Sequence, residues 1–165
     1  MTKVALLLAI AKTCKKAVRG LQLQTSVQQG DTELLRREPK VHIMRLPKST
    51  DAKKKAPYII VQYINGRQVR VKPPKPSRTA NVRFVFCVYD DDEQTGAINL
   101  LNVMDAVEME ILKAIKFGAC FTLDSDEPLE SLVYPDDTAP YYAGEMFGTF
   151  HLPPIEQEVD LFGKK

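Results

Sequence analysis

Cysteine and histidine are scarce in this sequence, and the common catalytic motifs are missing. The 165 residues include three cysteines, far apart and without a C-x-x-C pair, and two histidines, His42 and His151. Neither a zinc site with closely spaced ligands nor a disulfide framework is encoded. The chain also lacks G-x-x-x-x-G-K-[ST], G-x-G-x-x-G, G-x-S-x-G and H-E-x-x-H, which bind phosphates or zinc or present a nucleophilic serine. We therefore expect no enzyme, no cofactor, no metal and reduced thiols.

Long hydrophobic runs are also absent. No stretch approaches the ~18 apolar residues that span a membrane, so we expect no membrane partner. Residues 4–11 follow a lysine as a signal peptide would, but more lysines and no small-residue cleavage site come after them. The stretch is more typical of an amphipathic helix that ends at Gly20, with lysines opposite its apolar face. The predicted apolar face is Val4, Leu7, Leu8, Ala11, Cys14 and Val18.

Charge is divided unevenly along the chain, although the formal net charge is only +2. Residues 1–80 hold 18 Lys and Arg against 4 Asp and Glu, a net charge of +14, whereas residues 81–165 hold 5 against 17, a net charge of −12. A basic half alone would suggest nucleic acid. Because an acidic half accompanies it, the basic surface of one copy can instead meet the acidic surface of another. The charge pattern therefore favours self-assembly.

The rest of the first half predicts strands separated by polar loops. Residues 41–46 and 58–64 alternate or are rich in β-formers, and the N-G pair at 65–66 predicts a hairpin turn whose return is 69–71. Residues 21–39 are expected to be a connection with a helical turn near 32–36. Two basic segments are expected to be extended, a loop at 48–56 and a proline-rich arm at 72–78.

The second half predicts one central strand, one long helix and three short strands. Residues 81–89 form a nearly continuous β-branched and aromatic run that suits a central strand. Acids at 90–93 follow, where they favour the start of a helix. The helix is expected over 96–116, with Gly118 after its end, and the tail 156–165 is expected to be a loose arm. The predicted apolar arc of the helix is Leu100, Leu101, Val103, Met104, Val107, Ile111, Leu112 and Ile115. The three short strands are expected at 121–123, 129–134 and 144–152.

These elements predict an α+β fold in one domain that covers residues 1–165. A single mixed, mostly antiparallel sheet is packed by the N-terminal helix and the long central helix, with extended loops or arms. Glu108 lies within or beside the apolar arc, where a carboxylate usually faces solvent and sometimes pairs with an arginine of a neighbouring subunit. Asp124 and Asp126 begin a D-x-D pattern, but Pro128 stands where a calcium loop would continue.

Several segments together resemble the tail terminator proteins of tailed bacteriophages. The resemblance covers roughly residues 40–158: the strand and acids at 84–92, Gly96 with the helix residues 100–104, the aromatic strand that begins at 141–145, and L-P-P-I at 152–155. The Y-P pair at 134–135 and the strand P-Y-I-I-V at 57–61 after a basic loop also fit. Residues 21–39 and the proline-rich arm have no counterpart in the pattern.

The resemblance implies a structural virion protein rather than an enzyme. Such proteins form a ring, usually a hexamer, on the last ring of the tail tube at the head-proximal end, stop tube elongation and offer a surface to the head or neck. The implied partners are further copies of the chain, the tube protein, the sheath if the tail contracts, a head-closure or neck protein, and DNA that passes through the lumen without sequence-specific binding. The implied location is the virion, after assembly in the host cytoplasm.

Under this hypothesis charged residues take two roles. The candidate subunit-interface residues are Arg67, Arg70, Lys72, Asp90, Asp91, Asp92 and Glu108. The candidate tube- or DNA-facing residues are Lys48, Lys53, Lys54 and Lys55. No residue is assigned a catalytic or metal-binding role.

Other functions remain open from the sequence. A head-closure or tail-completion protein of similar fold, or the equivalent ring of a phage-tail-like bacteriocin, would share these features. A small nucleic-acid-binding protein that uses the basic half predicts strongly salt-dependent binding to duplex DNA. A metal-dependent enzyme would need Asp124 and Asp126.

The ring hypothesis predicts that Arg70→Glu weakens assembly, because the substitution replaces attraction to a neighbour's acids by repulsion. The mass of this variant in solution, measured by light scattering, is compared with that of Lys164→Glu, a matched charge reversal in the C-terminal segment 156–165. Equal masses for wild type and Arg70→Glu would discard the assignment of Arg70.

Overall fold

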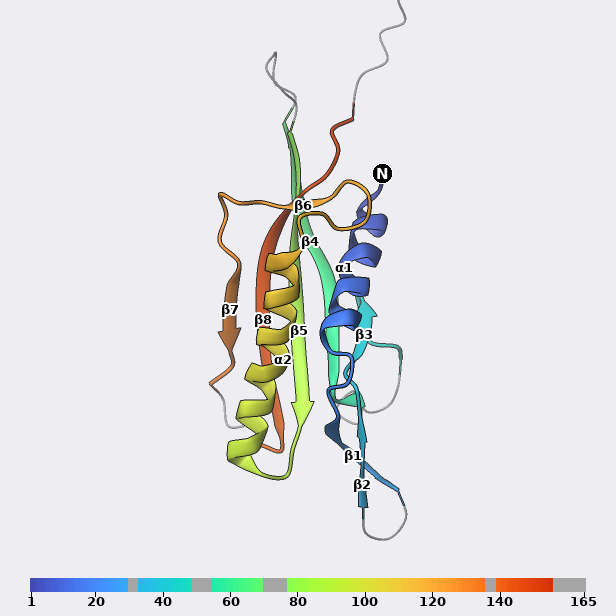
Figure 1. Ribbon diagram of the computed structural model, residues 1–165, viewed down its shortest axis with the longest axis vertical. Helices are drawn as coiled ribbons and strands as arrows, with labels where there is room; N and C mark the ends of the chain where they lie inside the picture. The colour runs from blue at the N-terminus through green and yellow to red at the C-terminus, as the bar shows by residue number, and fades with distance from the viewer. Residues whose placement is uncertain (30–32, 49–54, 70–76, 136–138, 156–165) are drawn as a thin grey trace, which may run out of the picture.

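The computed structural model describes residues 1–29, 33–48, 55–69, 77–135 and 139–155. Its elements follow the predicted α+β order, with two additional strands after the first helix (Figure 1). The order is α1 Lys3–Ala17, β1 Leu23–Gln29, β2 Glu33–Arg37, β3 Lys40–Ile43, β4 Tyr58–Val69, β5 Ser77–Tyr89, α2 Glu93–Lys113, β6 Thr122–Leu123, β7 Glu130–Val133 and β8 Tyr141–His151.

The main sheet has the strand order β3-β4-β5-β8-β6, and β7 pairs with the same outer edge of β8 as β6. The pair β3–β4 is parallel and the other pairs are antiparallel. This confirms the predicted mixed, mostly antiparallel sheet. β5 lies at the centre, paired along its length with β4 on one side and β8 on the other.

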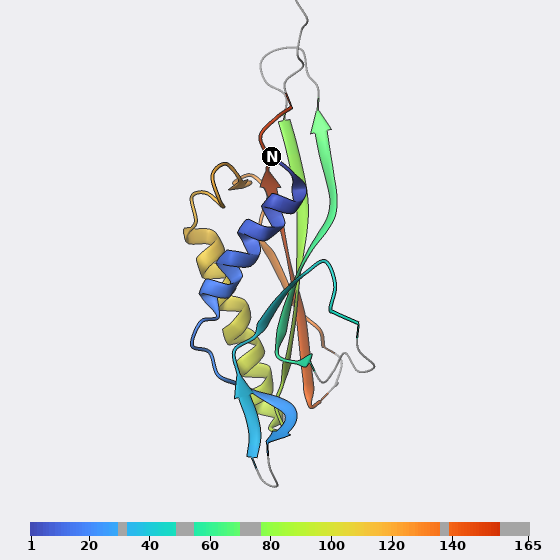
Figure 2. The same ribbon diagram turned by 90° about the vertical axis from the view of Figure 1, so that its right-hand side faces the viewer.

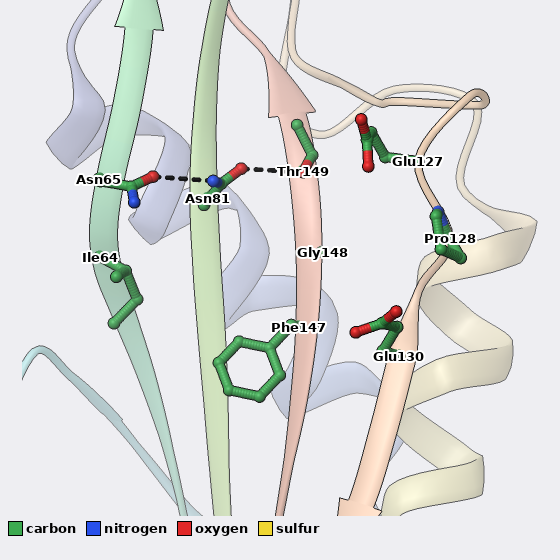
Figure 3. A pocket seen from close by; sticks show the side chains of 9 residues that line it. All are labelled: Ile64, Asn65, Asn81, Glu127, Pro128, Glu130, Phe147, Gly148 and Thr149. Atoms are coloured by element: carbon green, nitrogen blue, oxygen red, sulfur yellow. Dashed lines mark hydrogen bonds between the residues drawn. The ribbon is translucent and has the colours of Figure 1, made fainter.

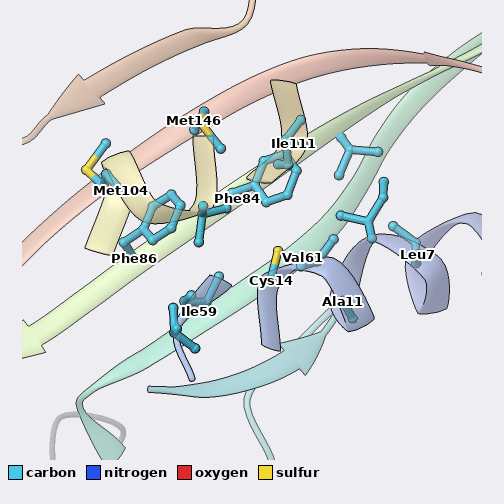
Figure 4. Close-up of a cluster of buried hydrophobic side chains, with 14 of the residues drawn as sticks. Leu7, Ala11, Cys14, Ile59, Val61, Phe84, Phe86, Met104, Ile111 and Met146 are labelled. Atoms are coloured by element: carbon cyan, nitrogen blue, oxygen red, sulfur yellow. The ribbon is translucent and has the colours of Figure 1, made fainter. Parts of the chain in front are cut away.

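Both helices pack on one face of the main sheet and leave the other face without a helix (Figure 2). Successive side chains of a strand point to opposite faces. On β5 the residues that point to the helices, such as Phe84 and Phe86, are fully buried, as are Ile59 on β4 and Met146 on β8 (Figure 4). From α1 and α2, Ile10 and Ile111 complete this core.

Local capping sets the helix starts. Thr2 accepts a hydrogen bond from the Ala5 N–H at 3.1 Å, and Asp92 accepts one from the Thr95 N–H at 2.7 Å. Side-chain acceptors at these positions satisfy N–H groups that the first helical turn leaves without partners. α2 therefore begins at Glu93, three residues before the predicted start. It ends at Lys113, and Gly118 lies instead in the bridge between Phe117 and Phe121.

The hairpin of β1 and β2 was not predicted, and the expected helical turn near 32–36 is wrong. These strands form a separate two-stranded sheet, in which the buried Thr25 donates from Oγ1 to the Leu35 carbonyl at 2.7 Å. Arg37 fastens the hairpin to the chain before β4 by donating from Nη2 to the Ala56 carbonyl at 3.0 Å. Side-chain to backbone hydrogen bonds thus help to hold a mostly polar segment in place.

The turn predicted at Asn65-Gly66 is also wrong. β4 runs straight through it to Val69, where it pairs with Ser77. The strand has an irregularity between Tyr63 and Asn65. This irregularity distorts the strand locally, but the chain does not reverse direction there. Because β5 begins at Ser77, the last two residues of the predicted arm 72–78 belong to a strand; residues 70–76 and the tail 156–165 lie outside the described residues.

Gly96 is needed where α2 crosses β8. A Cβ at this position would lie 2.1 Å from Tyr142 Cε2 and 2.7 Å from its Cζ. Gly96→Ala is therefore expected to destabilise the protein by about 1–3 kcal/mol, since the ring must move to admit the methyl group. Urea unfolding measures the change, with Gln94→Ala on the exposed side of the same turn as control. An unchanged midpoint for Gly96→Ala would contradict the close contact.

Candidate functional site

The two oppositely charged halves of the chain lie over different parts of the main sheet. α1, from the basic half, packs over β3 and β4, whereas α2, from the acidic half, packs over β5 and β8 (Figure 1). β3 and β7 lie at opposite edges of the sheet. Much of the separation of charge along the sequence therefore becomes a separation across the molecule, although the halves meet where Lys16 pairs with Glu110 and where Arg67 shares a hollow with Asp124 and Glu127.

Basic side chains gather at the β3 edge. We call this surface the basic side, and its residues are Lys12, Lys15, Arg19, Arg37, Lys40 and Lys55. His42 on β3 responds to this environment: partial burial lowers its pKa, and the positive charges of Lys55, Lys40, Arg37 and Lys15 lower it further. Lys12, Lys15 and Arg19, with two α1 neighbours, line a hollow of about 400 Å³.

Carboxylates of the acidic half lie on the other side. We call this edge of the molecule the acidic side: Asp105 and Glu108 lie on α2 in the helix layer, and Glu130 of β7 borders the open face at the same edge. Within the described ranges, none of these three carboxylates forms a hydrogen bond or an ion pair. Glu110, which faces α1, differs because it accepts from Lys16 Nζ at 2.7 Å. The side of α2 that faces away from α1 thus keeps uncompensated charge.

The predicted interface acids at 90–92 are used within the subunit. Asp90 is 7% exposed and accepts from Asn99 Nδ2 at 2.9 Å and from the Asp92 N–H at 3.0 Å. Asp91 accepts from Gln24 Nε2 at 2.8 Å and from the Tyr89 hydroxyl at 2.5 Å, which ties the β1–β2 hairpin to this end of the sheet.

Two pKa shifts reflect these contacts. The hydrogen bond to the Asp91 carboxylate, together with burial, raises the pKa of Tyr89 to about 12. The hydrogen bond from the Thr95 N–H lowers the pKa of Asp92. A contact of Asp91 or Asp92 with a neighbouring subunit stays a prediction. Asp90 is already buried within its own subunit, so its side chain presents little surface to a neighbour.

The predicted basic contact residues are partly within the described ranges. Arg67 is exposed on β4, far along the strand from the acids that follow β5. Lys48 is exposed on the connection after β3, which leaves on the side of the sheet away from the helices (Figure 2). Lys55 donates from Nζ to the Pro47 carbonyl. The predicted residues Arg70, Lys72, Lys53 and Lys54 lie outside the described residues.

The helices expose apolar side chains that the sequence pattern placed in the core. Leu101 and Leu112 of α2 are 47% and 58% exposed, and Ile115 lies after the helix end at 86%. On α1, Val4 and Leu8 are 61% and 56% exposed. The predicted apolar arcs are therefore wrong at these positions. The predicted arc on α2 is wider than the strip of a helix that one sheet covers, and this width was the available signal that part of it stays exposed.

The face of the sheet without helices carries a polar ladder beside exposed apolar groups (Figure 3). Asn81 donates from Nδ2 to Asn65 Oδ1 at 2.7 Å, and Thr149 donates from Oγ1 to Asn81 Oδ1 at 2.8 Å. With Phe147 and Glu130 these residues border a hollow of about 350 Å³. It offers a surface for binding and brings no nucleophile and base together.

An ion-paired cluster lies next to this hollow on the same face. Arg83 donates from Nε to Glu145 Oε2 at 2.6 Å and from Nη2 to the Tyr134 hydroxyl at 3.0 Å. These hydrogen bonds and the Glu145 carboxylate raise the pKa of Arg83 against the opposing effect of burial. The cluster fastens the segment after β7 onto the sheet.

His151 Nε2 lies 3.0 Å from Asp124 Oδ2, and the Asp126 N–H donates to Asp124 Oδ1 at 2.9 Å. Among the described residues, no three His, Cys, Asp or Glu side chains gather as metal ligands would. Nor does the described part of the chain contain a helix long and apolar enough to cross a membrane.

No protein-family model matches the chain, and no curated protein matches its sequence.

The cap of α2 yields a test of this region. Asp92→Ala is expected to lower Tm at pH 7, because the Thr95 N–H loses its acceptor. A carboxylate whose pKa is lowered on folding stabilises above its ordinary range, about pH 4, and that stability is lost as pH falls through the folded-state pKa. The Tm gap between wild type and variant should therefore narrow in acid.

Asp92→Asn is the matched control, since an amide oxygen still accepts from the N–H but does not titrate in this range. Thermal unfolding from pH 7 to pH 3 measures all three proteins. A gap that stays constant in acid would contradict the assigned hydrogen bond.

Proposed function

We propose that the protein is a structural subunit of a ring at the head-proximal end of a phage or phage-like tail, where it ends tube polymerisation and offers the attachment surface for the head or neck. One observation carries the proposal: most of the basic half of the chain lies toward the β3 edge of the sheet, and most of the acidic half lies toward the β7 edge. Copies set side by side then place unlike charges together at every contact. Contacts between two different surfaces close into a ring when the rotation allows.

The fold supports the same proposal. The strand, helix and aromatic strand that carry the resemblance to tail terminators are β5, α2 and β8, which pair or pack directly against one another. Their buried residues build the core, so this part of the resemblance concerns the framework of the domain. The function needs no catalytic residue, and its specificity rests on surfaces.

The open face and the connection that bears Lys48 lie on the same side of the sheet (Figure 2). In a ring this side has room for a partner, because no helix covers it. We assign to Lys48 and the basic loop 48–56 the contact with the tube or with passing DNA. Arg67, exposed on β4, is assigned to a contact between subunits.

The decisive experiment coexpresses the full chain with the tube protein encoded in the same morphogenesis module. Negative-stain images should show tubes of uniform length with a cap at one end, and light scattering should give a multimeric mass for the chain alone. A monomer that leaves tube length unchanged would overturn the proposal. Binding to a head-closure component without capping would identify the neck protein of similar fold instead.

A nucleic-acid-binding function is the second candidate, favoured by the cations of the basic side around His42. Cations that contact phosphates release counterions, so binding weakens steeply with salt. Titration of duplex DNA with the monomer at two salt concentrations separates the candidates. The ring proposal expects little affinity for free DNA, and tight, salt-sensitive binding without self-association would favour the second.

A further inference from the structure

The long helix α2 is apolar on two sides. Its buried side includes Leu100, Met104 and Ile111, all under 3% exposed. A second row of residues lies outward at spacings of three and four, which puts its members on one stripe at about 100° per residue. We call this row the α2 stripe, and it consists of Ile98, Leu101, Asp105, Glu108 and Leu112. The three apolar members of this row are between 47% and 58% exposed, so the second side of α2 presents apolar surface among the described residues.

The position of the α2 stripe follows from its neighbour. Glu110 marks the side of α2 that faces α1, because it pairs with Lys16. Glu108 is two positions earlier, about 160° around the helix from Glu110. The stripe therefore lies on the flank of α2 turned away from α1, toward the β7 side of the sheet.

α1 carries a matching row on its own outer flank. Its members have the same spacing, are all exposed and change from apolar to basic along the helix. We call this row the α1 stripe, and it consists of Val4, Leu8, Lys12 and Lys15. Lys12 and Lys15 form no ion pair in the described part of the chain, just as Asp105 and Glu108 form none.

The two stripes fit one another in an antiparallel register. α1 and α2 run in opposite directions within the subunit (Figure 1). Copies placed side by side in one orientation keep that relation between α1 of one and α2 of the next. Lys15 then meets Asp105, Lys12 meets Glu108 and Leu8 meets Leu112. The matching spacings of three and four residues let all three contacts form together.

We infer that the α1 stripe of one copy binds the α2 stripe of a second copy of this chain. The contact buries Leu8 and Leu112 and neutralises four charges that form no ion pair among the described residues of one subunit. It rests on the assembly of copies proposed above and names the surfaces that make it. Because the two stripes lie on opposite flanks of the helix layer, one contact uses one stripe of each copy, so an open array of copies keeps one free stripe of each kind until a ring closes.

The test is a charge swap in the full chain. Lys12→Glu with Lys15→Glu, and separately Asp105→Lys with Glu108→Lys, should each raise the dissociation constant of self-association at least about tenfold, since like charges then face one another. The protein with all four substitutions should recover wild-type assembly. Sedimentation and light scattering at low and high salt measure the masses. Asp126→Lys, in the exposed connection between β6 and β7, is the matched control.

Two results would overturn the inference. One is a wild-type chain that stays monomeric at every concentration; the other is a quadruple variant no better than either pair while circular dichroism shows all variants folded. If a variant fails to fold, a second measurement decides. Copies with Leu8→Cys are mixed with copies carrying Leu112→Cys, and a thiol cross-linker should join one of each. Absence of this mixed product would contradict the contact.

The readouts separate this inference from the proposed function. Mass and cross-linking need no tail tubes, whereas capping needs them. Copies that assemble through the stripes but leave tubes uncapped would overturn the tail function alone. Capping by the charge-reversed pairs, with full multimeric mass, would overturn the stripe contact alone.

Discussion

The structure depends on the central strand β5, which pairs with a neighbour on each side over most of its length. Its alternate residues Val82, Phe84 and Phe86 are fully buried under the helices. A shift of one residue in the pairing would turn all of them to the open face. Register, core and helix positions are therefore fixed together, and the resemblance to tail terminators is concentrated on this strand and the elements that touch it.

The same arrangement explains how a chain of nearly neutral charge presents two charged sides. β4 and β5 are adjacent, but the chain crosses from the basic to the acidic half near the start of β5. Elements before that point gather toward β3, and most of those after it gather toward β8. The open face between the two sides retains its own polar ladder at Asn65, Asn81 and Thr149. Charge and layering thus give one subunit three distinct surfaces.

The sequence predicted the framework well because β5 and α2 carry strong apolar patterns. It failed where tertiary contacts decide. The Asn65-Gly66 pair has the chemistry of a turn, but pairing with β5 on both sides of it holds β4 straight. The β1–β2 hairpin is polar and depends on contacts such as Arg37 with Ala56. Among the predicted interface acids, Asp90 accepts a hydrogen bond from Asn99 within the subunit. A count of charges along the sequence does not reveal this contact between residues nine positions apart.

The sequence pattern did identify Leu101 and Leu112 of α2 as apolar positions on a helix face. The prediction placed them against the sheet, whereas they lie on the exposed side. Seven of the eight predicted apolar positions lie on α2, and they exceed what a single sheet covers, so some of them are available to a second partner. Asp105 and Glu108 within the outer row limit what that partner can be, because an apolar partner would leave two carboxylates without compensation. A basic helix flank with leucine and lysine at the same spacing meets both demands, and α1 supplies one on the opposite side of the subunit. The two stripes lie on opposite flanks of the helix layer, so a contact through one stripe of each copy leaves the other two stripes available for further copies. This favours cyclic association over a twofold pair, which must bring both stripes into one contact.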